Sequence, residues 1–355
     1  MSGQGTESGI RQTLAIPQSS DAINGHRFAV APMLDWTDRH CRFFHRQLSG
    51  RALLYTEMVV AEAIIHGDRQ KLLRFDPAEH PLALQIGGSD PAKLALAARI
   101  GADFGYDEIN LNCGCPSDRV QSGIFGACLM RDPARVADCV AAMAAAIAVP
   151  VTVKCRIGVD EQDPEPALDT LADAVIGAGA GGLWVHARKA WLNGLSPKEN
   201  RDIPPLDYDR VHRLKARYPK FFIGINGGLK TLDDAEAVMA GRRGAPALDG
   251  VMLGRAAYHE PAMLATVDSR FYGEVGAAPD GEAVFAAMIP YAERVIADGA
   301  PLHHVTRHLL GLFHGRPGAR RFRQILTVEG ARRGAGVAVM RAALSAIGEA
   351  AAYAA

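Results

Sequence analysis

The sequence predicts an α/β protein, a TIM-type (β/α)8 barrel followed by a C-terminal all-α helical domain, and three observations lead to this prediction. Short apolar runs alternate with Ala- and Leu-rich helical patterns up to about residue 265, as βα units around a parallel sheet do. Beyond that point the strand patterns stop and helical patterns continue. The length of 355 residues accommodates a barrel of about 250 residues and a smaller addition.

Eight apolar runs are the predicted strands of the barrel. They are Phe28–Met33, Ala52–Met58, Leu82–Ile86, Glu108–Asn112, Val151–Arg156, Gly182–Ala187, Phe221–Asn226 and Gly250–Leu253. Eight strands that alternate with helices favour a closed barrel over an open doubly wound sheet, for which no fixed number of strands is expected.

The two ends of the chain differ from its middle. Residues 1–24 are polar and rich in Gly and Ser, which predicts a flexible tail before a barrel at 25–265. Helical patterns at 283–297 and 303–312 predict a helical domain at 270–345. A turn at 317–320 interrupts this domain, and a new helix is expected to start there.

Positive charge gathers near the C-terminus, although the whole chain has a formal net charge of zero. The zero balance excludes a protein that coats nucleic acid over its whole surface, so any contact with RNA must be local. Residues 301–333 are the candidate for such a contact, because they contain one acid, Glu329, against seven arginines. The arginines are Arg307, Arg316, Arg320, Arg321, Arg323, Arg332 and Arg333.

The composition excludes several other classes of protein. There is no apolar core of a secretory signal in the first 24 residues and no uncharged apolar run of about 18 residues, so we expect a cytoplasmic protein without membrane contact. The six cysteines form no C-x-x-C pair and have no regular spacing, which argues against a disulfide framework and against a metal site. No obligate protein partner is indicated.

Polar side chains follow nearly every predicted strand. Active sites of barrels lie at this C-terminal edge of the strands. A single polar residue there is as often a strand or helix cap, but agreement of six or more strand ends argues for a site. The residues are Met33–Asp35, Glu57, Gln85, Asn112, Lys154 with Arg156, His186 with Arg188, Asn226–Gly228, and Gly254 with Arg255.

The loop after the fourth predicted strand carries two thiols. Cys113 and Cys115 lie in the segment Asn110–Ser117, and Pro116 holds the backbone of Cys115 extended. A free cysteine is more often a small buried residue than a reactive one. The spacing alone does not decide between the two thiols.

Two glycine signals indicate a phosphate site. Gly227 and Gly228 follow the seventh predicted strand, and Gly254 follows the eighth. These are the loops at which barrels commonly bind phosphate through backbone N–H groups. The sequence has neither G-x-x-x-x-G-K-[ST] nor a well-placed G-x-G-x-x-G, which disfavours a nucleoside triphosphate or a Rossmann-bound dinucleotide. A mononucleotide such as FMN fits better.

Several segments together resemble the tRNA-dihydrouridine synthases, most closely the A-type, which acts in the D-loop of tRNA. The resemblance spans about residues 28–325. The matching segments are residues 31–38, 84–88, 110–120, 126–130, 153–156, 186–189, 226–228 and 253–255. Cys-Pro with an upstream Asn, the Lys-x-Arg strand end and the His-Ala-Arg-Lys loop occur in the family's order.

The resemblance assigns roles to individual residues. Cys115, the cysteine before proline, would be the catalytic acid, and Cys113 would be structural. The expected FMN contacts are Pro32, Met33, Leu34, Gln85, Lys154, His186, Asn226, Gly227, Gly228, Gly254 and Arg255. Asn112 and Arg156 would face the uracil, and the other expected substrate or tRNA contacts are Arg188, Lys198, Arg320 and Arg323.

The reaction implied by the resemblance is the reduction of uridine to 5,6-dihydrouridine in tRNA, expected at U20 and U20a. NADPH would reduce a tightly bound FMN, flavin N5 would deliver hydride to C6 of an extruded uracil, and Cys115 would donate a proton to C5. Lys154 would face the flavin edge where negative charge gathers.

Two other interpretations stay open. A related flavin barrel would reduce a free pyrimidine with a similar cysteine, although a basic helical domain has no purpose in such an enzyme. A catalytically inactive barrel that only binds RNA is the second alternative, and a protein that cannot be reconstituted with FMN would favour it.

Overall fold

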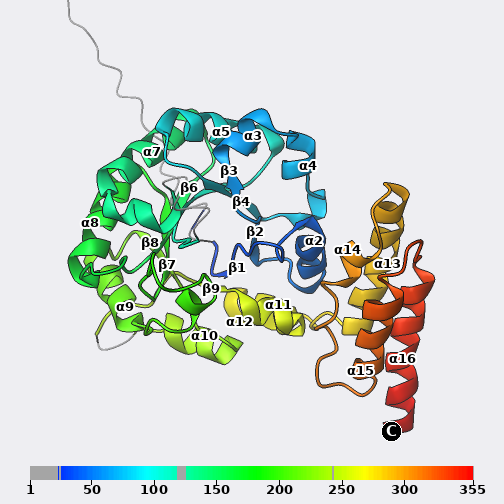
Figure 1. The fold of residues 1–355 in the computed structure, drawn as a ribbon. Helices are drawn as coiled ribbons and strands as arrows, with labels where there is room; N and C mark the ends of the chain where they lie inside the picture. The colour runs from blue at the N-terminus through cyan, green and yellow to red at the C-terminus, as the bar shows by residue number, and fades with distance from the viewer. Residues whose placement is uncertain (1–22, 24, 118–124, 242–243, 355) are drawn as a thin grey trace, which may run out of the picture.

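The structure is a computed structural model that describes residues 23, 25–117, 125–241 and 244–354. Eight parallel strands form a closed ring (Figure 1), because β2 pairs with both β1 and β4 while the other strands pair in chain order. This arrangement confirms the predicted (β/α)8 barrel. The strands are β1 (Phe28–Val30), β2 (Leu53–Tyr55), β4 (Leu82–Gly87), β5 (Glu108–Cys113), β6 (Val151–Arg156), β7 (Gly182–His186), β8 (Phe222–Asn226) and β9 (Gly250–Leu253).

The first two strands are shorter than the sequence predicts. The first strand ends at Val30 instead of Met33, because Pro32 has no N–H to donate and the chain turns when the Thr37 N–H donates to the Met33 carbonyl at 2.9 Å. Of the predicted run 52–58 only β2 is a strand, and a separate short strand, β3 (Val59–Val60), follows the run; both pair with β4. The residues between β2 and β3 leave the ladder, and there the Glu57 carboxylate accepts the Asp35 N–H at 2.5 Å.

Helices cover the outside of the barrel, and three of them begin in the same way. In α5, α7 and α8 an Asp caps the first turn with its carboxylate and a Pro occupies the first helical position, where no N–H is needed. The helices around the barrel are α2 (Arg39–Leu48), α3 (Ala61–His66), α4 (Arg69–Leu73), α5 (Pro91–Phe104), α7 (Pro133–Ala146), α8 (Pro164–Gly177), α9 (Tyr208–Arg217), α10 (Leu232–Met239), α11 (Arg255–His259) and α12 (Val267–Tyr272). Short 3-10 turns occur at Pro77–Glu79, Gly126–Arg131, Glu199–Arg201 and Pro261–Thr266.

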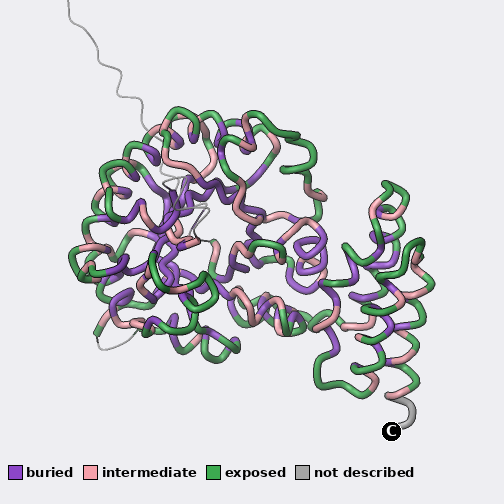
Figure 2. Tube along the Cα trace, viewed as in Figure 1, coloured by how far each residue is buried: buried purple, intermediate pink, exposed green. Residues whose placement is uncertain are grey.

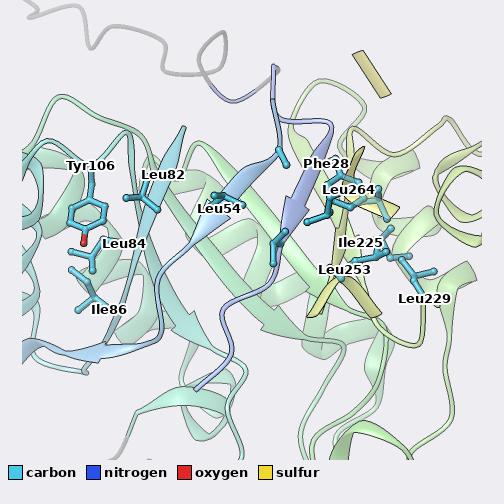
Figure 3. Close-up of a cluster of buried hydrophobic side chains, with 14 of the residues drawn as sticks. Phe28, Leu54, Leu82, Leu84, Ile86, Tyr106, Ile225, Leu229, Leu253 and Leu264 are labelled. Carbon is cyan, nitrogen blue, oxygen red and sulfur yellow. The ribbon is translucent and has the colours of Figure 1, made fainter. Parts of the chain in front are cut away.

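Buried residues gather along the strands of the barrel (Figure 2), and the alternation along these strands divides their side chains into two layers. One set packs between the strands and the helices, and Figure 3 shows part of it, with Leu54, Leu84 and Ile225 among its members. The other set fills the interior of the barrel. It consists of Ile23, Ala29, Ala31, Leu53, Tyr55, Ala83, Trp184, Phe222 and Met252.

The predicted C-terminal helical region is present. It contains α13 (Gly281–Ala297), α14 (His303–Thr306), α15 (Ala319–Gln324), a π-helical turn (Ile325–Glu329) and α16 (Ala338–Ala354). The predicted turn before α15 is confirmed, with Gly318 at φ +81°. The predicted helix at 303–312 is wrong beyond Thr306, since Gly311 approaches the His259 carbonyl so closely that even a Cβ would not fit.

The helical region packs against α2 on one side of the barrel (Figure 1). Phe43 of α2 stacks on Tyr291 of α13 with ring centroids 4.0 Å apart. Asp38, which caps α2, also binds Arg307 at 2.6 Å and His308 at 3.0 Å. The limits proposed for the three parts of the chain stay predictions, and the tail at 1–24 lies outside the described residues apart from residue 23.

Candidate active site

The alternation of β5 sorts its residues between the barrel interior and the outer layer. Ile109, Leu111 and Cys113 belong to the outer apolar cluster, where Cys113 is fully buried. Asn110 and Asn112 have the opposite parity and point inward. Cys113 therefore has the structural position that the resemblance implies for it.

Cys115 lies on the loop that follows β5, at the C-terminal edge of the barrel. The backbone N–H groups of Gly114 and Cys115 both donate to Oδ1 of Asn112 at 3.0 Å. The Cys115 side chain is half-buried, and its sulfur lies 3.5 Å from the Ser117 hydroxyl oxygen. Asn112 thus fixes the backbone that carries the thiol.

Asn112 and Gln85 are bound to each other. Nδ2 of Asn112 donates to Oε1 of Gln85 at 2.8 Å, and Gln85 is almost completely buried. The roles predicted for these side chains, uracil contact for Asn112 and FMN contact for Gln85, stay predictions. Their observed partners are protein groups below the mouth of the barrel.

Lys154, near the end of β6, is a buried amine at the same edge. Its Nζ donates to Oδ1 of Asn226 at 3.2 Å, and Nδ2 of Asn226 donates to the Met252 carbonyl at 2.7 Å. Burial, together with the charge of Arg156, lowers the pKa of Lys154 to about 8. A negative group bound beside it would restore the charged form.

Arg156 connects the loops that follow β5 and β7. Its guanidinium donates to the carbonyl of Gly114 at 3.2 Å and to those of Lys189 and Asn200 at 3.0 and 2.8 Å. Burial lowers the pKa of Arg156 to about 10, which still leaves it charged at neutral pH. Whatever contact it makes with a substrate, Arg156 braces the Cys115 loop.

The end of β7 carries buried polar atoms that lack partners. Within the described part of the chain, Nε2 of His186 and Nε of Arg188 are buried without a hydrogen-bond partner. Burial and the charges of Arg156 and Lys154 hold the pKa of His186 well below its ordinary value, so its ring is neutral. Buried polar atoms of this kind are rare unless a ligand or water satisfies them.

The glycines after β8 and β9 border these atoms. A Cβ on Gly227, which has φ +118°, would lie 2.7 Å from the His186 ring, and one on Gly228 would lie 2.5 Å from Leu206. A Cβ on Gly254 would make ordinary contact with the Met33 sulfur at 3.5 Å. The loops after β1, β7, β8 and β9 thus meet at one edge.

The three remaining predicted cofactor contacts in these loops differ in exposure and pairing. Leu34 is 69% exposed, an unusual setting for a large apolar side chain. Arg255 forms an ion pair with Asp202 at 2.6 Å. Pro32, at the start of the loop that follows β1, is half-buried.

The matching family model covers most of the molecule described above. Residues 29–347 match the model described as Dihydrouridine synthase (Dus). The chain belongs to the dihydrouridine synthase family. The matched range includes the C-terminal helices α13 to α15 as well as the barrel, so the helical region is part of what the family shares.

Curated relatives are similar over nearly their whole length. The chain is 55% identical to a tRNA-dihydrouridine(20/20a) synthase of Xanthomonas campestris over 91% of this chain and 94% of the relative. It is 51% identical to the protein of the same name from Escherichia coli K12 over 98% of this chain and 99% of the relative. The relative from Shewanella oneidensis is 53% identical over 90% and 93%.

In this member of the family, three of the predicted substrate or tRNA contacts lie apart from the strand ends, whereas Arg188 directly follows β7. Lys198 is exposed on the loop after β7, and Arg320 and Arg323 lie on α15 in the helical region. Two of the seven C-terminal arginines form ion pairs within the protein, Arg307 with Asp38 and Arg316 with Glu282, and Arg321 donates to the Gln324 side chain. The basic stretch predicted from the sequence is therefore not one continuous free surface.

A basic pocket that the sequence analysis missed lies beside the barrel mouth, between α2, α4 and α14. Its volume is about 370 Å³, and its charged and titratable lining carries more positive than negative groups. The sequence offered one signal for this pocket, the helical spacing of basic residues. Lys71 and Arg74 are three residues apart, and His303 and Arg307 are four apart. The charged and titratable lining residues are Asp38, Arg39, His40, Arg42, Glu57, Lys71, Arg74, His303, His304 and Arg307.

Two kinds of feature are absent from the described part of the chain. No group of three or more His, Cys, Asp or Glu side chains there is arranged to hold a metal ion. None of the helices described has both the length and the apolar character that crossing a membrane requires.

Proposed function

We propose that this protein reduces uridine to 5,6-dihydrouridine in the D-loop of tRNA, at positions 20 and 20a, with FMN as its bound cofactor and NADPH as its reductant. The observation that carries the proposal is the half-buried thiol of Cys115, held by Asn112 and Arg156 on a loop at the mouth of the barrel. The names of the relatives support the choice of substrate.

The residues at the mouth suit FMN. His186 and Arg188 have buried nitrogens without a partner, and Gly227 brings the backbone after β8 close to the His186 ring. Lys154 would supply positive charge at the same edge. When bound and reduced, FMN would supply the two electrons and the hydrogen that C6 of the pyrimidine receives.

Cys115 would supply the other hydrogen of the product. Addition at C6 places negative charge on C5 and O4 of the uracil, and a proton must reach C5 to complete the reduction. The Cys115 thiol donates that proton from a fixed loop. Arg156 holds this loop through the Gly114 carbonyl.

The first test separates flavin chemistry from proton donation. We expect Cys115→Ala to bind FMN and to be reduced by NADPH as the wild type is, while its rate of uridine reduction falls about 100-fold or more. The control is Cys113→Ala, two residues away on the same segment with its thiol in the outer layer, which should keep most of the activity. Dihydrouridine is measured in tRNA after incubation with NADPH. Unchanged turnover by Cys115→Ala would refute the assignment.

The second test concerns the contact with tRNA. The basic pocket and the exposed arginines of α15 are the two candidate surfaces, since phosphate contacts need accessible cations. We expect the double variant Lys71→Glu with Arg74→Glu to weaken tRNA binding about tenfold or more and to reduce its salt dependence.

The same measurement on Arg320→Glu with Arg323→Glu tests α15. The matched control is Arg99→Glu, an exposed cation on the outer helix α5, which should leave the affinity for tRNA unchanged. If a double variant binds tRNA as tightly as the wild type does, the two residues that it changes do not contact tRNA. Reduction of free uracil at a rate comparable to that of tRNA would instead favour a free-pyrimidine enzyme.

A further inference from the structure

The barrel interior contains a chain of polar side chains that ends at the Cys115 loop. The chain starts at the first residue of β5 and crosses between three neighbouring strands, β4, β5 and β6. All its members are buried, with exposed fractions of 8% or less. They are Glu108, Thr152, Asn110, Gln85 and Asn112.

Each link of the chain is a short hydrogen bond. From the loop inward, Asn112 Nδ2 donates to Gln85 Oε1 at 2.8 Å, and Gln85 Nε2 donates to Asn110 Oδ1 at 2.8 Å. Asn110 Nδ2 then donates to the Thr152 hydroxyl at 2.8 Å, and that hydroxyl donates to Glu108 Oε1 at 2.5 Å. Every donor points away from the loop.

The direction of the chain is determined at both ends. At the loop, two backbone N–H groups can only donate, so Asn112 must turn its oxygen toward them and its nitrogen toward Gln85. Because each amide nitrogen must face an acceptor oxygen, the orientation of Asn112 then fixes the amides of Gln85 and Asn110. At the other end, Glu108 Oε1 accepts from Thr152 and also from the Tyr55 hydroxyl. Reversing any single link would place two donors face to face.

We propose that Glu108 is a positioning residue for Cys115. Through Thr152, Asn110 and Gln85 it fixes which way the Asn112 amide faces, and Asn112 in turn holds the backbone of Gly114 and Cys115. A merely space-filling role does not account for a directed chain, because the interior elsewhere is filled by apolar side chains such as Trp184 and Met252. The effect of Glu108 on catalysis by Cys115 rests on the proposed function. The claim that Glu108 fixes the backbone of Gly114 and Cys115 does not rest on it.

The test cuts the chain in its middle. Thr152→Val keeps the shape of the side chain and removes the hydroxyl, and Thr152→Ser restores the hydroxyl. The matched control is Val153→Ala, the next residue of the same strand, whose side chain belongs to the outer layer. Asn110→Leu cuts the neighbouring link and serves as the second variant if Thr152→Val does not fold.

The first readout is amide hydrogen exchange in the protein without substrate. We expect Thr152→Val to speed hydrogen exchange at the amides of Gly114 and Cys115 about five- to tenfold relative to the amides of β5. This is the effect of losing about one net hydrogen bond. Thr152→Ser should return these two amides to the wild-type rate. Val153→Ala should change them no more than it changes the rest of the strand.

The second readout is catalysis by the FMN-loaded enzyme. We expect kcat for uridine reduction to fall about tenfold in Thr152→Val, with KM for tRNA and the rate of flavin reduction by NADPH unchanged, and to recover in Thr152→Ser. Wild-type exchange at Gly114 and Cys115 in Thr152→Val would overturn the proposal, as would the same local change in Val153→Ala. If the wild type does not reduce uridine, the proposed function fails, and the exchange rates still decide the hold on the loop.

Discussion

At the scale of single residues, burial changes the chemistry of groups that the sequence shows only as letters. Glu108 is the clearest case, because it is an acid at the start of a strand. In the fold it is fully buried, and burial raises its pKa to about 7 against the opposing hydrogen bonds from Thr152 and Tyr55. The neutral acid is therefore the form that the folded state prefers.

This preference predicts how stability depends on pH. Between about pH 4.5 and 7 the unfolded chain binds fewer protons at Glu108 than the folded protein does, so the free energy of unfolding falls as the pH rises through this window. Glu108→Gln removes the dependence while keeping an oxygen that can accept from Thr152. We expect the free energy of unfolding of Glu108→Gln, measured relative to that of the wild type, to rise by about 3 kcal/mol from about pH 4.5 to about pH 8. The reason is that each tenfold change in proton affinity corresponds to about 1.4 kcal/mol.

Urea denaturation at the two pH values measures this gain. The control is Glu274→Gln, because Glu274 is an exposed acid in a surface ion pair with Arg51. A difference between Glu108→Gln and the wild type that is the same at both pH values would contradict the prediction.

The sequence allows part of this residue-level picture to be predicted. The resemblance implies a structural Cys113, and in the fold the alternation along β5 places Cys113 in the outer layer, apart from Asn110 and Asn112. Which partner each inward side chain binds is not predictable in this way, because partners such as Gln85 and Asn110 come from different strands, and the register in which β4 and β5 pair decides which side chains meet. The basic pocket has the same origin in three separate helices.

At the scale of elements, the turn after β8 shows why a loop needs particular residues. Gly227 has φ +118°, and a side chain there would also meet the His186 ring. The strand ends were well predicted where apolar runs stop at such glycines. They were not predicted after β1 and β2, where the strands end because Pro32 and Thr56 redirect backbone hydrogen bonds.

Gly227→Ala tests the proposed cofactor site through this turn. We expect a stability loss of about 1–3 kcal/mol from the left-handed backbone, and a loss of FMN affinity of tenfold or more because the Cβ displaces His186. The control is Gly194→Ala, also at positive φ but with open space around its Cβ, which should reduce stability alone. Quenching of flavin fluorescence gives the affinity, and equal affinity in the two variants would argue against His186 as an FMN contact.

At the scale of the whole molecule, one carboxylate joins the barrel to the helical region. Asp38 caps α2 and binds Arg307 and His308 across 269 and 270 residues of sequence. Burial alone would raise the pKa of Asp38, but the hydrogen bond and charge of His308 outweigh it and hold that pKa well below its usual range. The Asp38 carboxylate therefore stays ionised at neutral pH, and its bonds to Arg307 and His308 weaken only in strong acid.

Asp38→Asn separates the two roles of this residue. Asn caps a helix as well as Asp does, so α2 should persist, while the carboxylate charge that binds Arg307 and His308 is lost. We expect a stability loss of about 1–3 kcal/mol, faster hydrogen exchange in α13 and α14, and weaker tRNA binding because the basic pocket shares these residues. The control is Asp280→Asn, the same change at the cap of α13. If both variants loosen the helical region equally, the bonds of Asp38 to Arg307 and His308 have no particular part in holding it.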